Sequence, residues 1–173
     1  MKFDPNRSFN ADEVFGMAER IEQNAADFYT KAACLHAQTS DVQFLNKLAA
    51  MELGHRDLFA ALRAKLPPAS REPPAADPYL KASIYLNSIA DAGGGEGTLS
   101  NATPLAATDT LIGIVRRGIR MELEAVAFYV GVKEVVPAES GRSQIDRIIA
   151  EERGHVVVLA DELRKLLTLR RRQ

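Results

Sequence analysis

The strongest constraint on this chain is a four-residue unit that occurs twice, as Glu52-Leu53-Gly54-His55 and as Glu152-Arg153-Gly154-His155. Residues three apart on a helix share a face, so each glutamate and its histidine should point the same way. Apolar residues surround both units at steps of three and four, which is the spacing of a buried helix seam. They are Leu45, Leu48, Phe59, Leu62 and Leu66 in the first copy, and Ile145, Ile148, Leu159 and Leu166 in the second. The pattern therefore predicts charged side chains at core positions.

The two units belong to a longer internal repeat. A shift of 100 positions aligns segment 14–66 with segment 114–166, and it pairs Glu22 with Glu122 and Tyr29 with Tyr129. In each copy, a glutamate with a tyrosine seven residues later precedes the Glu-x-x-His unit by 30 positions. This combined pattern is far more specific than Glu-x-x-His alone, and it indicates two related helical hairpins.

Turn and breaker residues divide the chain into a first hairpin over 10–66, a connection over 67–104 and a second hairpin over 105–169. At 173 residues, these parts fit a single domain over 1–173. Two short turns joined by one long crossover predict an all-α protein, a four-helix bundle of the ferritin-like type. Within the crossover, the prolines between 67 and 78 predict an extended stretch, and residues 79–91 predict a short extra helix.

Helix ends and buried faces can also be predicted. Asn10 is expected to cap the first helix, which should run to about Ala37. The third helix should begin near Thr108 or Asp109. The predicted inward face of the first helix is Phe15, Ala18, Glu22, Ala25, Tyr29 and Ala32. The predicted seam of the third helix is Ile112, Val115, Ile119, Glu122, Val126 and Tyr129.

Composition argues against several classes of function. The formal net charge of −1 gives no case for nucleic-acid binding. Cys34 is the only cysteine, so neither a disulfide framework nor a thiolate metal site can form within one chain. The first residues lack the apolar run of a signal peptide, and no stretch approaches the length of a membrane span. We therefore expect a cytoplasmic protein with no membrane or nucleic-acid partner.

The seams bring four carboxylates and two imidazoles to one level of the predicted core. The residues are Glu22, Glu52, His55, Glu122, Glu152 and His155. Four uncompensated buried carboxylates would exceed the net stability of a whole domain, about 5–15 kcal/mol. The acidic pocket is therefore expected to be tolerable only with two divalent cations. Glu52 and Glu152 would bridge them, and each ion would take one histidine and one terminal glutamate. Oxygen and nitrogen ligands without thiolate suit iron or manganese, with zinc as an alternative.

Two further residue pairs accompany the predicted ligands. Tyr29 and Tyr129 lie two helical turns from a ligand glutamate and on its side of the helix. Each is either a hydrogen-bond partner of a bridging glutamate or an ordinary core residue. Gly54 and Gly154 lie within helices, where glycine costs about 1 kcal/mol relative to alanine. Room for a close helix approach is one explanation for both glycines.

These motifs resemble the rubrerythrin branch of the ferritin-like superfamily. The resemblance rests on Glu22-x6-Tyr29, Glu52-x-x-His55, Glu122-x6-Tyr129 and Glu152-x-x-His155. It covers the four main helices and implies two iron ions in a non-haem centre that reacts with dioxygen or hydrogen peroxide. The implied outcome is peroxide reduction, ferrous iron oxidation, or both. The prediction of a homodimer rests on this resemblance alone.

Two features depart from the family pattern. Peroxide-reducing rubrerythrins usually carry paired cysteines in a rubredoxin-like domain, whereas this chain has one cysteine, so we expect an external electron donor. Ala125 replaces an extra carboxylate one turn beyond the third-helix glutamate, which weakens a redox-driven ligand switch. Three hypotheses stay open: a di-iron oxidoreductase of peroxidase or ferroxidase type, a non-catalytic metal-binding or iron-sequestering bundle, and a helical interaction module without metal.

Overall fold

Four long helices make up most of the protein. The computed structural model describes residues 10–36, 41–71, 105–136, 138 and 141–171. The helices are α2 (Ala11–Leu35), α3 (Asp41–Ala64), α5 (Leu111–Val135) and α6 (Arg142–Arg170), and the short 3-10 helix η1 (Pro68–Arg71) follows α3. These residues contain no strand, so the prediction of an all-α protein is confirmed for them. None of the described helices combines the length and the apolar character that a membrane span requires.

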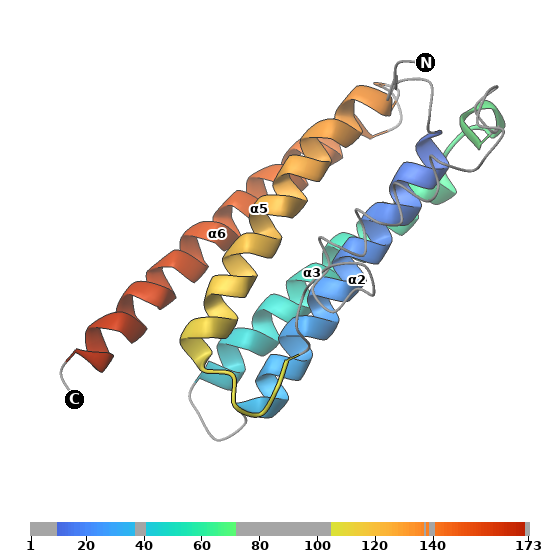
Figure 1. The fold of residues 1–173 in the computed structure, drawn as a ribbon. Helices are drawn as coiled ribbons and strands as arrows, with labels where there is room; N and C mark the ends of the chain where they lie inside the picture. Colours follow the sequence, from blue (N-terminus) through green and yellow to red (C-terminus); the bar gives the residue numbers. More distant parts are fainter. Residues whose placement is uncertain (1–9, 37–40, 72–104, 137, 139–140, 172–173) are drawn as a thin grey trace, which may run out of the picture.

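The helices pair into two antiparallel hairpins. α2 packs against α3, and α5 packs against α6. Figure 1 shows the two hairpins lying side by side with their long axes aligned. α3 and α5 run in the same direction, so the end of α3 and the start of α5 lie at opposite ends of the bundle. Most of the connection between them, 72–104, and the short helix predicted within it lie outside the described residues. Its first part forms η1, where the sequence predicted an extended stretch.

Local sequence explains where two of the helices begin. The Asn10 side chain accepts a hydrogen bond from the Glu13 N–H at 2.8 Å, and the Glu13 carboxylate accepts one from the Asn10 N–H at 3.1 Å. This reciprocal capping box confirms the predicted start of α2, which ends at Leu35. Gly141 precedes α6 with a φ of 113°, and a Cβ there would lie 2.9 Å from Leu62. Glycine is therefore required at this turn for both conformation and space.

The described residues form an apolar core of two clusters, and polar residues separate them on each of the four long helices. Along α2, buried residues up to Ile21 belong to one cluster and those from Ala25 onward belong to the other, with Glu22 between them. The division falls at Glu122 on α5, and at the Glu-x-x-His units on α3 and α6. A polar layer is thus enclosed by apolar side chains on both sides. The inward faces predicted for α2 and α3 are confirmed.

The seam predicted for α5 is partly wrong. Three of its members, Ile112, Ile119 and Val126, are only half-buried. The positions that replace them in the core are Ile114, Met121 and Ala125. The outer side of α5 is also apolar, because Leu123 and Val130 are 53% and 48% exposed, so apolar periodicity does not mark its buried face. α5 also begins at Leu111, slightly later than predicted, and Leu166 on α6 is half-buried.

Candidate metal centre

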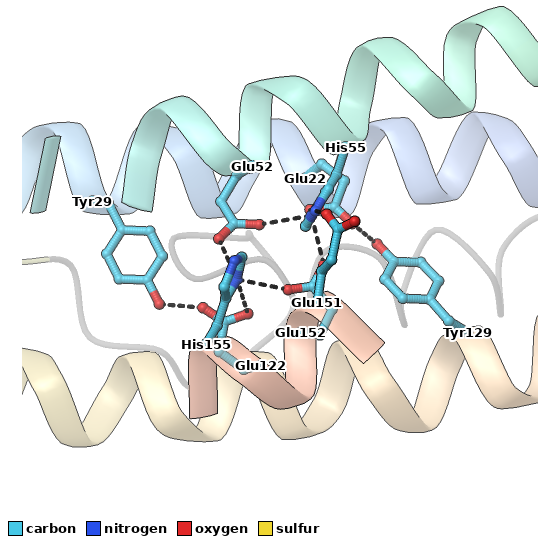
Figure 2. Close-up of polar contacts among 9 residues, drawn as sticks. All are labelled: Glu22, Tyr29, Glu52, His55, Glu122, Tyr129, Glu151, Glu152 and His155. Atoms are coloured by element: carbon cyan, nitrogen blue, oxygen red, sulfur yellow. Dashed lines mark hydrogen bonds and ion pairs between the residues drawn. The ribbon is translucent and has the colours of Figure 1, made fainter. Parts of the chain in front are cut away.

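Six buried polar side chains from all four helices meet in the layer between the two apolar clusters (Figure 2). They are Glu22 from α2, Glu52 and His55 from α3, Glu122 from α5, and Glu152 and His155 from α6. None of them is more than 5% exposed. Within α3 and α6, the three-residue spacing turns both side chains of each unit to the same face. The structure therefore brings together all six residues that the sequence singled out, and their role as metal ligands stays a prediction.

The six side chains form two overlapping groups. One group is Glu22, Glu52, His55 and Glu152, and the other is Glu52, Glu122, Glu152 and His155. Within each group, one ligand atom per residue lies within 4.8 Å of all the others, so each group could hold a metal ion. Glu52 and Glu152 belong to both groups and occupy the places that the sequence predicted for bridging carboxylates.

Both histidines turn Nδ1 toward the shared carboxylates. His55 Nδ1 lies 2.8 Å from Glu152 and 3.5 Å from Glu52. His155 Nδ1 lies 2.9 Å from Glu152 and 3.2 Å from Glu52. The two imidazole rings are stacked, with centroids 5.5 Å apart and planes inclined by 18°. The imidazoles and the shared carboxylates therefore face one common space from opposite hairpins.

These contacts have ion-pair distances but not the directions of hydrogen bonds. Both Nδ1 atoms and all four carboxylate oxygens of Glu52 and Glu152 are buried without a hydrogen-bond partner among the described residues. Two ligand atoms at right angles and about 2.1 Å from one ion lie about 3 Å apart. The observed separations between Nδ1 and the shared carboxylates, 2.8–3.5 Å, are close to that value. The spacing of the donor atoms is therefore compatible with a divalent cation between them.

The two tyrosine hydroxyls lie at the ends of the polar layer (Figure 2). Tyr29 donates a hydrogen bond to Glu122, and Tyr129 donates one to Glu22. Both bonds cross from one hairpin to the other, and both tyrosines are fully buried. The predicted bridging-glutamate partner is wrong, because each hydroxyl reaches the edge of the layer, where the terminal glutamate of the opposite hairpin lies. Both tyrosines are also members of the apolar core clusters, so each one combines a core position with a hydrogen bond to the site.

The carboxylates of the site differ in protonation. Burial raises the pKa of Glu22 well above its ordinary range, and it raises the pKa of Glu122 to about 8. Burial would also raise the pKa of Glu52, but the adjacent imidazoles of His155 and His55 outweigh it and lower this pKa to about 2. At neutral pH and without metal, Glu122 therefore holds a proton while Glu52 is ionised, and burial favours the protonated form of Glu22 as well.

The histidines hold protons as well. Burial would lower the pKa of His155, but the carboxylates of Glu122, Glu152 and Glu52 outweigh it and raise this pKa to about 12. Burial would also lower the pKa of His55. The carboxylates of Glu152, Glu22 and Glu52 outweigh it and raise the pKa of this imidazole far above its ordinary value. The expectation that the pocket holds two divalent cations stays a prediction, and these pKa shifts add a second source of compensating charge. Protons on the histidines and on the terminal glutamates compensate the pocket when metal is absent.

Glu151 is a contact of the site that sequence reasoning missed. Its carboxylate lies 2.9 Å from Nε2 of His55, on the opposite side of the ring from the shared carboxylates. The Glu151 side chain is 51% exposed, so this contact joins the buried layer to the surface. No spacing rule pointed to it, because Glu151 and His55 lie on different hairpins and the equivalent position of the first repeat is Met51.

The glycines beside the histidines do not make room for a neighbouring helix. A Cβ at Gly54 or Gly154 would meet nothing within 4 Å, so the explanation by close helix approach is wrong within this chain. Nothing in the described residues explains these two glycines. A close approach occurs instead at Gly118, where a Cβ would lie 2.9 Å from the Tyr29 hydroxyl oxygen.

The site is a set of oxygen and nitrogen donors enclosed by apolar side chains, and such a set can bind divalent metal ions. A shared fold would not by itself reveal what the site does. Comparisons with protein-family models, curated proteins and solved structures found no match to this chain.

Proposed function

We propose that this chain is a non-haem di-iron carboxylate protein of the rubrerythrin type, whose centre reacts with dioxygen or hydrogen peroxide. The observation that carries the proposal is the pair of donor groups that share Glu52 and Glu152. One further glutamate and one histidine for each ion complete the donor set of ferritin-like di-iron and di-manganese proteins. Four carboxylates and two divalent cations also form a neutral site, which a buried position favours.

The helix arrangement supports the ferritin-like type of bundle. α3 and α5 run in the same direction, which requires one long crossover between two antiparallel hairpins (Figure 1). Ferritin-like bundles have this connectivity, whereas simple up-and-down bundles need only short loops. The sequence repeat between 14–66 and 114–166 agrees with it, because each hairpin supplies the same kinds of donor.

Each side chain of the site has a role in this proposal. Glu52 and Glu152 would bind both ions, and each ion would take one histidine and one terminal glutamate. The terminal glutamates are held in place by hydrogen bonds from Tyr29 and Tyr129. Such partners orient ligands and tune their basicity.

The six ligands would hold iron, and bound iron would supply the redox chemistry for reduction of dioxygen or hydrogen peroxide. The chain contributes the enclosure, because apolar clusters exclude water on both sides of the polar layer. It also contributes carboxylates that give up protons as cations bind. Manganese and zinc fit the same donors, so the donor set alone does not select iron.

Two properties limit how closely the proposed centre follows rubrerythrins. Ala125 is buried in an apolar cluster where an extra carboxylate ligand would be expected, so no ligand exchange is proposed at that position. These 173 residues contain one cysteine, Cys34, and therefore no paired-cysteine site for electron delivery, so the proposal takes its electrons from a donor outside them. The homodimer and the cytoplasmic location stay predictions.

Anaerobic loading with ferrous ions, followed by addition of hydrogen peroxide or dioxygen, tests the proposal. We expect two ferrous ions per chain and rapid growth of near-ultraviolet ferric absorption with matching consumption of oxidant. Glu52→Ala and Glu152→Ala should each abolish stoichiometric loading, because each removes a ligand from both groups. Asp161→Ala, which changes an exposed acid on α6, is the control and should load normally.

The same experiment separates the rival hypotheses. Two bound ions that oxidise no faster than ferrous ions in buffer would indicate a structural or sequestering centre instead of an oxidoreductase. Full loading of both alanine variants would refute the ligand assignment. Absence of bound metal from all proteins, including the unsubstituted chain, would leave the helical interaction module as the surviving hypothesis.

A further inference from the structure

The two histidines of the site differ on the side of the ring that faces away from the shared carboxylates. Nε2 of His55 lies 2.9 Å from the Glu151 carboxylate, an accepting partner that comes from the opposite hairpin (Figure 2). Nε2 of His155 is buried and has no hydrogen-bond partner among the described residues. The repeat gives a reason for the difference, because Met51 occupies the position equivalent to Glu151. A thioether is only a weak acceptor.

A hydrogen bond at Nε2 determines how a histidine presents its other nitrogen. When Nε2–H is donated to Glu151, the proton is fixed on Nε2 and the Nδ1 lone pair is available toward the donor group. The ring is also held in one orientation, with Nδ1 facing Glu152 at 2.8 Å. Among the described residues, no such hydrogen bond holds the ring of His155 in the same orientation. Partners of this kind typically change metal affinity by about 10–100-fold when they are removed.

We infer that Glu151 is a positioning residue that makes the two cation sites unequal, so that the site containing His55 fills first and more tightly. The inference rests on the proposed function, because it presumes that both donor groups bind a cation. Glu151 touches His55 from outside and belongs to neither donor group. Its position at the surface, 51% exposed, allows it to be replaced with little disturbance of the core.

Titration of the metal-free full-length chain with Co²⁺, followed by visible absorption and by calorimetry, tests the inference. We expect two binding steps whose dissociation constants differ by about tenfold or more. Glu151→Ala should weaken the tighter step by about 10–100-fold and leave the weaker step unchanged. Glu151→Gln should retain most of the tight step, because an amide oxygen can accept the same hydrogen bond. Asp161→Ala should match the unsubstituted chain.

Three results would overturn the inference: no change in either step in Glu151→Ala, equal weakening of both steps, or a loss in Glu151→Gln as large as in Glu151→Ala. Helical circular dichroism of each variant excludes misfolding as a cause.

In the Zn²⁺-loaded protein, nitrogen-15 spectra of the histidines should show one slowly exchanging Nε2–H that disappears only in Glu151→Ala. Failure of the proposed function has a different signature, because Co²⁺ would then bind to no variant, or would bind equally well to Glu52→Ala.

Discussion

Loading the metal-free protein with two divalent cations should release about four protons per chain at pH 7. The number counts the four groups whose pKa is raised in the empty site: Glu22, Glu122, His55 and His155. Each of them has to give up one proton when its ligand atom binds a cation. Glu52 contributes none, because its pKa is already about 2.

The release should depend on pH with a definite sign. The pKa of Glu122 is about 8, so the empty protein loses this proton as pH rises from 7 to 9, and the release should fall to about three. The apparent metal affinity should increase with pH, less steeply above about pH 8.

In the metal-free protein, the folded-state pKa of Glu122 lies above its ordinary value of 4.5. Its contribution to stability is therefore fully present below about pH 4.5 and is lost as pH rises through about 8.

Calorimetric titration with Mn²⁺ in buffers of different ionisation enthalpy measures the number of protons directly. The observed enthalpy, plotted against the ionisation enthalpy of the buffer, has that number as its slope. Glu122→Gln is the matched control, and it should release about one proton fewer at pH 7 and show no further decrease at pH 9. A release below about two protons, or one that is constant between pH 6 and 9, would refute the assignment of protons to these four groups.

Two other predictions concern stability in denaturant. Gly118→Ala should destabilise the metal-free protein by about 1–3 kcal/mol, because its Cβ would lie 2.9 Å from the Tyr29 hydroxyl, whereas Gly54→Ala should stabilise it by up to about 1 kcal/mol. Equal effects of the two changes would contradict this reading of the glycines. Tyr129→Phe should cost about 1–3 kcal/mol in the metal-free protein, because Glu22 loses a buried hydrogen bond. An unchanged unfolding midpoint would show that the hydrogen bond from Tyr129 to Glu22 contributes nothing to the stability of the metal-free protein.

Much of the fold and most of the site could be predicted because their signals are local. The seam predicted from Leu45 to Leu66 follows helical periodicity through α3 and just past its end, and every predicted member is buried. The Glu-x-x-His units could be placed in the core for the same reason, since apolar neighbours at steps of three and four fix the face of the helix. The 100-residue shift then linked Glu22 and Glu122 to them.

The parts that could not be predicted depend on how the two hairpins meet. The buried face of α5 was misplaced because Leu123 and Val130 make its outer side apolar too. The partners of the tyrosines and of His55 come from the opposite hairpin, and spacing within one helix says nothing about that register. The protons in the empty site also depend on three-dimensional proximity, since the pKa values of Glu122 and Glu52 move in opposite directions despite equivalent chemistry.

The hydrogen bonds that Tyr29 and Tyr129 make across the interface have a consequence for the origin of the chain. Neither half can build a donor group from its own residues, since each group takes a carboxylate from the other half. Two identical copies of one hairpin, related by a twofold axis, would nevertheless supply every donor and both hydroxyls. Duplication and fusion of such a self-complementary ancestor would yield this arrangement and free the halves to diverge, as they have at Met51 and Glu151.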